Sequence, residues 1–330
     1  MDKKVVVTGY GLIEAKSFID KDKKNNLFQL CKEIDSNQLI NGRLKRKIDN
    51  FCIRGLIAVD AALKMSKLDI KLFNPYEIGI SVGNSLGGWK YIEEEVIQLH
   101  KNGIKEVSPY LATAWFPAAL QGQISIMYGI KGFSKTYSMI DLAGMQAIGN
   151  AVETIKNGKC KVMIAGASED FSSKFVQNTL AQSYRKLISN NSTDFFTDAA
   201  LFFILEDYEV ALKRGAKIYC EIEEFLEYGD KATKKINELY LKYLDNKSQM
   251  IYYKDCLYEN ENNILENILS LNKVKVSTIK NISKNQFSVS GIINILHAVK
   301  KMKENNKIKK AIIQKLSYMK QNNVMIINNI

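Results

Sequence analysis

The stretch YSMIDLAGMQAIGNA, residues 137–151, places an acidic side chain at a junction where many enzymes carry their nucleophile. The apolar run 136–140 indicates a strand, and the three- and four-residue spacing of the apolar residues after Asp141 indicates a helix. A strand that turns sharply into a helix presents the residue at the bend beside the positive end of the helix. The sequence therefore predicts that Asp141 lies at such a bend.

Three roles for Asp141 fit this position. As an N-cap, its carboxylate would accept a hydrogen bond from a backbone N–H of the first helical turn, a role that Asp fills well. As an active group, it would serve as acid, base or acyl acceptor. As a structural group, it would contact a partner subunit. Residue type alone favours the N-cap.

Other candidates for catalytic chemistry are scarce. The chain has two histidines: His100 stands before KNG at the predicted end of a helix, and His297 stands on an amphipathic helix four residues after Ile293. Neither has a catalytic neighbour in the sequence. Five cysteines show neither a close pair nor a metal-ligand spacing, so we expect reduced thiols and no metal site. They are Cys31, Cys52, Cys160, Cys220 and Cys256.

Composition indicates an ordinary globular protein, with 330 residues of which 46% are hydrophobic. The sequence shows neither a leader-like apolar start nor a run of about 20 apolar residues, so we expect a cytoplasmic protein that does not enter a membrane. The net charge is +12, but the lysines are scattered and Arg43 to Lys47 is the main cluster. A solvated basic surface, which also suits an acidic protein partner, is favoured over nucleic-acid binding. GNSLGG lacks the Lys and Ser/Thr of a phosphate loop, and we expect no nucleotide.

Alternating strand and helix patterns predict an α/β fold. Buried strands are expected at 5–8, 78–82, 136–140, 162–165 and 201–205, with a helix from Leu142 to Ile155 that stops at Gly158. A second series follows: strands at 218–222, 250–253 and 274–279, and helices at 234–244, 264–271 and 288–303. Two comparable halves are thus predicted, 1–206 and 207–330.

Several segments, in a fixed order, carry a family resemblance: VVVTGYG, IGISVGNSLGGWKYIEEE, VSPY, GQISIMYGIKG, AIGNAVETIKNGKCKVMIAGASE and FFILEDYEVALKRGAKIYCEI. Together they resemble the β-ketoacyl-acyl-carrier-protein synthases. The resemblance is strong from Lys3 to Glu221 and thinner afterwards. It implies the thiolase-like fold, five layers αβαβα built from two pseudo-duplicated halves.

The resemblance also implies a catalytic pattern that this sequence does not keep. In the family, a cysteine at the bend attacks an acyl thioester, two histidines stabilise the enolate formed by decarboxylation, and a lysine orients the set. Here Asp141 matches the cysteine, Asn285 the second histidine and Lys280 the lysine, while Lys254 or Asp255 falls nearest the first histidine. The glycine-rich gating loop is also missing from LSYMKQNNVMIINNI. We therefore expect no condensation by this chain alone.

The catalytically silent members of the family, the chain-length factors of type II polyketide synthases, are most similar. AWFPAALQGQISI, residues 114–126, and DLAGMQAIG resemble their interface and elbow segments, although their usual substitute for the cysteine is glutamine. This resemblance implies a heterodimer with an active ketosynthase, which shapes the tunnel for a polyketide or polyene. It also implies an acyl carrier protein that brings its own phosphopantetheine, and no cofactor bound by this chain.

The resemblance implies that residues 107–122 form a helix on the tunnel floor, across the dimer interface. Trp115 and Phe116 are then expected to define a tunnel end, with Tyr110, Ala112 and Ala119 beside them, because packed interiors yield little to added methylenes. The alternative is that both aromatics are ordinary interface packing. Two other functions stay open: a thiolase-fold acyl transferase or hydrolase that uses Asp141, and a homodimeric scaffold that binds acyl chains or the carrier protein.

Overall fold

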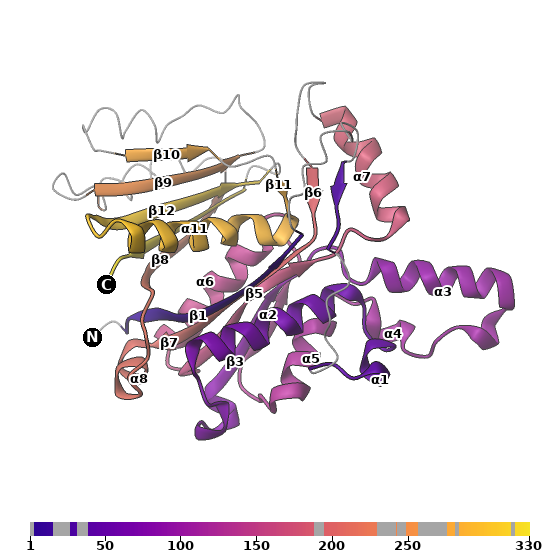
Figure 1. Ribbon diagram of the computed structural model, residues 1–330, viewed down its shortest axis with the longest axis horizontal. Coiled ribbons are helices and arrows are strands. Elements are labelled where there is room, and N and C mark those ends of the chain that lie inside the picture. Colours follow the sequence, from indigo (N-terminus) through magenta and orange to yellow (C-terminus); the bar gives the residue numbers. More distant parts are fainter. Residues whose placement is uncertain are drawn as a thin grey trace.

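The computed structural model describes residues 3–15, 27–31, 39–187, 195–229, 242, 249–256, 276–280, 284–317 and 321–330 (Figure 1). Within these residues, a ten-stranded mixed sheet has the order β10-β9-β12-β13-β8-β1-β7-β5-β3-β4. Its strands are β1 (Val5–Glu14), β3 (Ile78–Gly83), β4 (Ser134–Tyr137), β5 (Val162–Glu169), β7 (Ala199–Asp207), β8 (Cys220–Gly229), β9 (Gln249–Cys256), β10 (Val276–Lys280), β12 (Ile308–Leu316) and β13 (Gln321–Asn328).

The sheet contains the same five-strand pattern twice. In the first half, β3 pairs parallel with β4 and β5, and β7 joins β5 to β1 by antiparallel pairing. In the second half, β9 pairs parallel with β10 and β12, and β13 joins β12 to β8 by antiparallel pairing. The halves meet where Val5–Val7 of β1 pair with Cys220–Ile222 of β8. The topology thus repeats along the chain, and the boundary at residue 206 stays a prediction.

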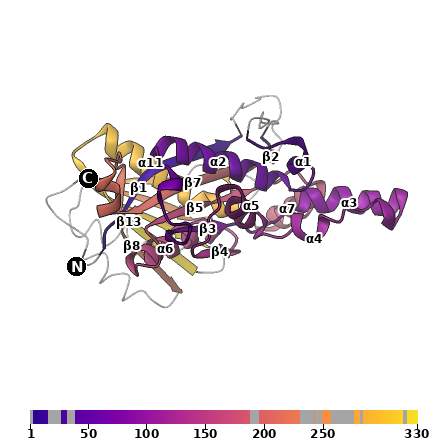
Figure 2. The ribbon, with the colours of Figure 1, turned by 90° about the horizontal axis from the view of Figure 1, so that it is seen from below.

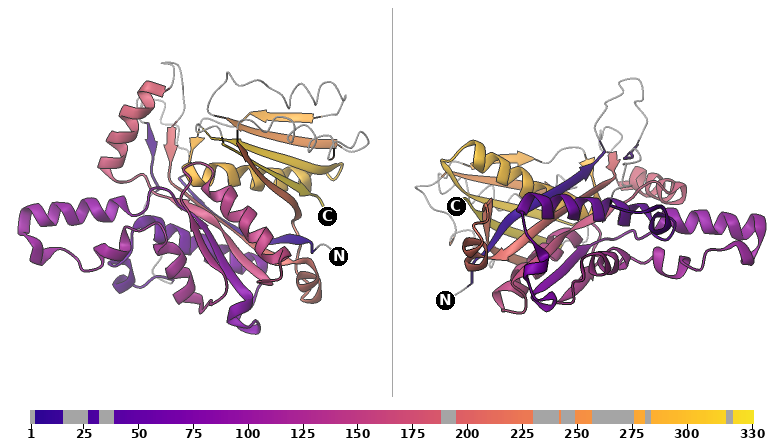
Figure 3. Two further views of the ribbon diagram at one scale, coloured as in Figure 1. Left: turned by 180° about the vertical axis from the view of Figure 1, so that it is seen from behind. Right: turned by 60° about the horizontal axis from the view of Figure 1, so that its bottom comes forward.

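The helices lie in layers around the two halves of the sheet. They are α1 (Gly42–Lys45), α2 (Asn50–Ser66), α3 (Trp89–Asn102), α4 (Leu111–Ala114), α5 (Ala119–Tyr128), α6 (Ala143–Lys156), α7 (Lys174–Leu187), α8 (Tyr208–Lys213) and α11 (Ser290–Glu304). Helices α2 and α5 cover the outer face of the first half, and α6 and α11 lie between the halves (Figures 1 and 3).

Strand alternation explains this layering. On β5, Met163 and Ala165 face the central cluster that α6 and α11 fill, whereas Val162 and Ile164 face the outer cluster with α2 and α5. Successive side chains of a strand point to opposite faces, so a strand buried on both faces is apolar throughout. The apolar run VMIA therefore contributes side chains to both hydrophobic clusters.

Most of the expected elements are confirmed, with their ends moved. The five predicted strands of the first half overlap β1, β3, β4, β5 and β7. The helix predicted to stop at Gly158 is α6, and Gly158 adopts φ +72° just after its end. The strand predicted to reach residue 140 ends at Tyr137, because the chain turns at Ile140 with φ +48°. The helix predicted at 264–271 lies outside the described residues, and of the helix predicted at 234–244 only residue 242 is described, where it is helical.

A single helix over 107–122 was the wrong expectation. The structure has α4 and α5, with a break at residues 115–118 that contains Pro117. Proline has no backbone N–H and its ring disfavours helical geometry in the residue before it. The break therefore falls at Trp115 and Phe116.

The approach of α6 to the 3-10 turn Phe287–Val289 gives a stability test. A Cβ at Gly144 would collide with the carbonyl oxygen of Ser288. We expect Gly144→Ala to lower the free energy of unfolding by about 1–3 kcal/mol, as overpacking does, measured by urea denaturation. Gly122→Ala is the matched control, because a Cβ there meets nothing within 4 Å and removing a helical glycine stabilises. Equal losses in both variants would contradict this packing.

Candidate functional site

The bend before α6 is strained and held by two hydroxyl groups. Ile140 adopts φ +48°, a region that β-branched residues rarely occupy. Its carbonyl oxygen accepts a hydrogen bond from the Ser85 hydroxyl at 3.0 Å, and Ser288 Oγ lies 3.1 Å away. Ser85 comes from the first half and Ser288 from the second. The backbone of the bend is therefore held by serine side chains from both halves of the chain.

Asp141 is buried at this bend, with 2% of its surface exposed. Its Oδ2 lies 3.5 Å from Nζ of Lys315, near the end of β12, and both side chains are 2% exposed. Within the described residues, neither carboxylate oxygen accepts a hydrogen bond. The N-cap of α6 is Leu142, which has no capping side-chain bond. The N-cap role expected for Asp141 is therefore wrong, because its carboxylate faces β12 instead of the first helical turn.

A buried carboxylate organises the loops around the bend. Glu169, at the end of β5, accepts backbone N–H bonds from Ser85 at 2.7 Å and Leu86 at 3.2 Å. It also accepts hydrogen bonds from the Ser288 hydroxyl and, at 3.3 Å, from the side-chain amide of Asn84. Burial raises the pKa of Glu169 to about 7, against the opposing effect of these hydrogen bonds. Glu169 thus ties the loop after β3 to Ser288 of the second half.

Asn285 also has a structural role. Asn285 lies in β11 (Lys284–Asn285), which with β6 (Phe195–Thr197) and β2 (Phe28–Gln29) forms a three-stranded parallel sheet. Its Oδ1 accepts the backbone N–H of Phe287 at 3.0 Å, and Phe287 adopts φ +45°. An amide does not titrate as an imidazole does. Asn285, which the resemblance matches to the second histidine, therefore stabilises a strained turn.

The remaining predicted positions are placed only in part. Lys280 on β10 pairs in register with Lys254 on β9, and Asp255 follows on β9; the side chains of these three residues lie outside the described part of the structure. His100 is exposed in the last turn of α3, which projects away from the body (Figure 2). His297 lies seven residues along α11 from Ser290, about 10 Å of helix. The structure brings neither histidine to Asp141.

The predicted interface residues lie together at the surface. Trp115 and Phe116 are 44% and 52% exposed, and their rings meet edge to face at 5.7 Å. Tyr110 and Ala112 are exposed and Ala119 is partly buried. The ammonium of Lys47 lies 4.4 Å from the centre of the Tyr110 ring. Large aromatic side chains gathered at a surface are typical of a site that another molecule covers.

Helix α3 extends this surface as an arm (Figures 2 and 3). At its base, Trp89 stacks on Phe175 of α7 at 4.9 Å, and Glu93 accepts the backbone N–H groups of Lys174 and Phe175 at 3.0 and 3.2 Å. Beyond this base, Val96, Ile97 and Leu99 are exposed. The arm is thus anchored at one end and presents apolar side chains at the other.

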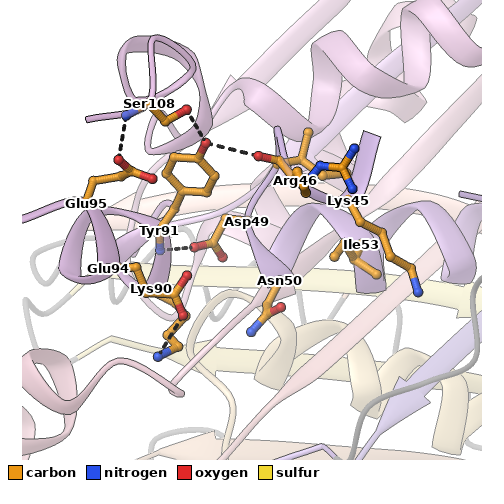
Figure 4. Close-up of a pocket in the computed structure, with 11 residues that line it drawn as sticks. Lys45, Arg46, Asp49, Asn50, Ile53, Lys90, Tyr91, Glu94, Glu95 and Ser108 are labelled. Atoms are coloured by element: carbon orange, nitrogen blue, oxygen red, sulfur yellow. Dashed lines mark hydrogen bonds and ion pairs between the residues drawn. The ribbon is translucent and has the colours of Figure 1, made fainter. Parts of the chain in front are cut away.

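An open pocket of about 430 Å³ lies between α2 and the base of the arm. Figure 4 shows its hydrogen bonds: the Tyr91 hydroxyl meets Ser108 Oγ at 2.8 Å and the Arg46 carbonyl at 3.1 Å, and Asp49 accepts the Tyr91 N–H at 2.7 Å. The other lining residues are Lys45, Ile48, Asn50, Ile53, Lys90, Glu94 and Glu95. Mixed charges line this pocket, with Lys45 and Arg46 at its α1 side and Lys90, Glu94 and Glu95 on α3.

The described residues contain no group of three His, Cys, Asp or Glu side chains placed to hold a metal ion. Among the same residues, none of the helices has the length and apolar character needed to cross a membrane.

Comparison with known proteins now identifies the chain. Residues 5–204 match the family model "Beta-ketoacyl synthase, N-terminal domain". The 3-oxoacyl-[acyl-carrier-protein] synthase 2 of Vibrio cholerae is 29% identical over 67% of this chain and 56% of its own length. The chain spans about half the length of the curated relatives it matches.

Solved structures match over the whole chain. A chain of AntDE:AntF, a type II PKS acyl-carrier protein in complex with its ketosynthase bound to the hexaketide, aligns over 100% of both chains with a TM-score of 0.87 and 36% identity. The ishigamide ketosynthase/chain length factor covers 100% of both chains with a TM-score of 0.77 and 13% identity, which shows the fold alone. The thiolase-like α/β fold is thus confirmed. The chain belongs to the β-ketoacyl synthase family.

Sequence reasoning missed the partner of Asp141. Lys315 stands in the strand AIIQKL, where a charged residue among apolar ones signals a buried partner of opposite charge. The hydroxyl of Ser288 was also missed, as were the positive φ angles of Ile140 and Phe287. Neither β-branched nor aromatic residues signal a left-handed backbone, so these two angles had no local sequence signal.

The raised pKa of Glu169 predicts a pH dependence of stability. A carboxyl whose pKa rises from 4.5 to about 7 on folding binds more protons in the folded state, so stability falls as pH rises through that window. We expect Glu169→Gln to flatten this fall by an amount on the order of 1–3 kcal/mol, measured by urea unfolding on either side of the window.

Asp49 does not confuse this measurement. Burial and the negative charge of Asp170 raise the pKa of Asp49 to about 7 as well, so the pH dependence of wild-type stability includes both groups. Because Asp49 is present in both proteins, the difference between the profiles of wild type and Glu169→Gln isolates the contribution of Glu169. Exposed Glu153→Gln should leave the pH profile unchanged. A Glu169→Gln profile parallel to wild type would show that Glu169 does not take up a proton on folding.

Proposed function

We propose that this chain is a non-catalytic, chain-length-factor-like subunit that pairs with an active ketosynthase. The pair elongates an acyl chain carried by an acyl carrier protein, and this subunit shapes the tunnel. The observation that carries the proposal is the bend before α6, where a buried Asp141–Lys315 ion pair stands in place of a thiol.

Chemistry supports the absence of condensation. Chain transfer in the family needs a thiolate that accepts the acyl group and imidazoles that stabilise the enolate. Asp141 has no sulfur and is buried against Lys315, and Asn285 is bonded to the backbone of Phe287. The same ion pair favours a structural role for Asp141 over the acyl transferase or hydrolase that the sequence left open.

The surface supports a second subunit. Strand β4 is the last strand of the sheet order in the described residues, with Ser134 and Lys135 exposed, and a strand edge presents unpaired backbone groups to another chain. Trp115 and Phe116 are exposed near it, at the break before α5, which packs against β4. The AntDE:AntF structure contains a ketosynthase and its carrier protein. These features favour a ketosynthase as the subunit that covers the aromatic pair.

The carrier protein suits the basic side of the pocket in Figure 4. Arg43 and Arg46 are exposed on and just after α1, next to Lys45 and Lys47. An acidic partner is attracted to such a cluster, and the attraction raises the rate of encounter more than the final affinity. The phosphopantetheine would arrive on the carrier, so this proposal needs no cofactor held by the chain.

Pairing is tested by co-expression with a ketosynthase that keeps its cysteine and both histidines. We expect the two chains to co-purify and condensation to require both. Because aromatic side chains dominate interface energies, Trp115→Ala with Phe116→Ala should weaken pairing by about 2 kcal/mol or more, roughly 30-fold in Kd, measured by sedimentation.

Leu212→Ala is the matched control, since Leu212 is 48% exposed on α8 and lies away from α4 and α5 (Figure 1). It should leave pairing unchanged. Condensation by the isolated chain would contradict the proposed subunit role. A stable homodimer that does not bind the ketosynthase would favour the homodimeric scaffold that binds acyl chains or the carrier protein.

Tunnel shape is tested separately in an active pair. If the Phe116 ring closes the tunnel, Phe116→Ala should shift the products to longer chains by freeing the volume of the ring, measured by mass spectrometry of carrier-bound products. Trp115→Ala tells which of the two rings sets the limit. Unchanged product length in both variants would show that Trp115 and Phe116 are ordinary interface packing. It would not contradict the proposed association with a ketosynthase.

A further inference from the structure

The aromatic pair, Trp115 and Phe116, is held through its main chain by the loop after β3. The backbone N–H of Gly88 donates to the Trp115 carbonyl oxygen at 2.8 Å. A Cβ at Gly87 would lie 2.4 Å from the same oxygen, and a Cβ at Gly88 would lie 2.4 Å from the Ala114 carbonyl oxygen. Glycine permits this close approach of two backbones. The position of the aromatic pair therefore depends on the position of the loop.

The loop in turn is held by one buried carboxylate. Oε1 of Glu169 accepts the backbone N–H of Ser85 at 2.7 Å, and Oε2 accepts the backbone N–H of Leu86 at 3.2 Å. The side-chain amide of Asn84 donates to Oε2 at 3.3 Å, and its own oxygen accepts the backbone N–H of Gly87 at 2.8 Å. Glu169 is fully buried, so water does not replace a bond that is lost. Both carboxylate oxygens are thus used to shape the loop.

The two ends of the loop are attached separately. At its start, the backbone N–H of Asn84 donates to the Tyr137 carbonyl at 3.0 Å. At its end, the Gly88 carbonyl accepts the Ile92 N–H at 3.1 Å in the first turn of α3. The middle of the loop is bonded to Glu169 and Asn84. Loss of one Glu169 oxygen is therefore expected to loosen the middle of the loop and to leave its ends attached.

We propose that Glu169 is the positioning residue for the aromatic pair. Acting through the loop after β3, it fixes where the main chain presents Trp115 and Phe116, and with them the surface that a ketosynthase covers. The importance of this positioning for pairing rests on the proposed subunit role. The positioning itself does not, because every contact lies within one chain.

Tryptophan fluorescence of the isolated chain tests the positioning. The chain has two tryptophans, and Trp89→Phe leaves Trp115 as the one emitter while keeping an aromatic ring beside Phe175. In this background, Glu169→Gln keeps the size of the side chain and replaces one acceptor oxygen by a donor amide. We expect the emission maximum to move to longer wavelength by several nanometres and quenching by acrylamide to rise, because the ring gains contact with water.

Glu206→Gln in the same background is the matched control. Glu206 is also a fully buried carboxylate, bonded to Thr8 and Arg214. It pairs in register with Val162, the first residue of β5, whereas Glu169 is the last residue of that strand. The control should leave the emission of Trp115 unchanged even if it lowers stability.

Unchanged emission in Glu169→Gln, or an equal shift in Glu206→Gln, would overturn the proposal. If Glu169→Gln does not fold, Asn84→Ala takes its place, because it removes the side chain that joins Glu169 to Gly87. The same shift is expected, and its absence has the same meaning.

A double-mutant cycle then asks whether Glu169 acts on pairing through the aromatic pair. The Kd for the ketosynthase is measured for wild type, Glu169→Gln, the chain with Trp115→Ala and Phe116→Ala, and the combination of all three changes. We expect Glu169→Gln to weaken pairing several-fold in wild type and much less in the chain that lacks both rings.

Equal weakening in both backgrounds would show that Glu169 does not act through the aromatic pair and would overturn its role in pairing. A ketosynthase that does not bind the wild-type chain would contradict the proposed subunit role alone. The emission of Trp115 would still decide whether Glu169 positions the aromatic pair.

Discussion

Backbone contact between the two halves of the chain is the constraint on which the site depends. Gly144 of α6 approaches the carbonyl of Ser288 so closely that a Cβ would collide with it, and the Ser288 hydroxyl reaches Glu169 of the first half. The bend between β4 and α6 is shaped by these contacts. The position of the side chains at the bend is therefore set by backbone contacts between the two halves.

Within that geometry, two residues that the resemblance matches to catalytic positions make structural contacts. The aspartate at the bend pairs with a lysine from β12, and the asparagine at the second-histidine position bonds to the turn after it. Each substituted residue stabilises the structure locally. Both residues therefore contribute contacts that hold the fold together at this site.

Much of the fold could be predicted from the sequence. The apolar runs of β3, β5 and β7 are buried on both faces, so their composition alone marks them, and the spacing of Met145, Ile148 and Val152 marks α6. Pro117 marked the break between α4 and α5, although the resemblance to the family led us to expect one helix there.

The interactions of the candidate site could not be predicted from the sequence. The match of Asp141 and Asn285 to catalytic positions stays a prediction. The Asp141–Lys315 pair joins residues 174 positions apart, so the lysine in AIIQKL signals a buried partner but not which residue that partner is. The N-cap expected for Asp141 follows a true preference of the residue type. A charge from the other half of the chain outweighed that preference, and such a long-range contact is invisible to local pattern analysis.

The contacts of the Ile140 carbonyl carry one more consequence. The Ser85 hydroxyl donates to this oxygen and Ser288 Oγ lies 3.1 Å from it, so the main chain just before residue 141 is held without any atom of the Asp141 side chain. That position is consequently open to exchange between sulfur, amide and carboxylate over evolutionary time, because a duplicated gene can lose its reactivity there without first losing its architecture.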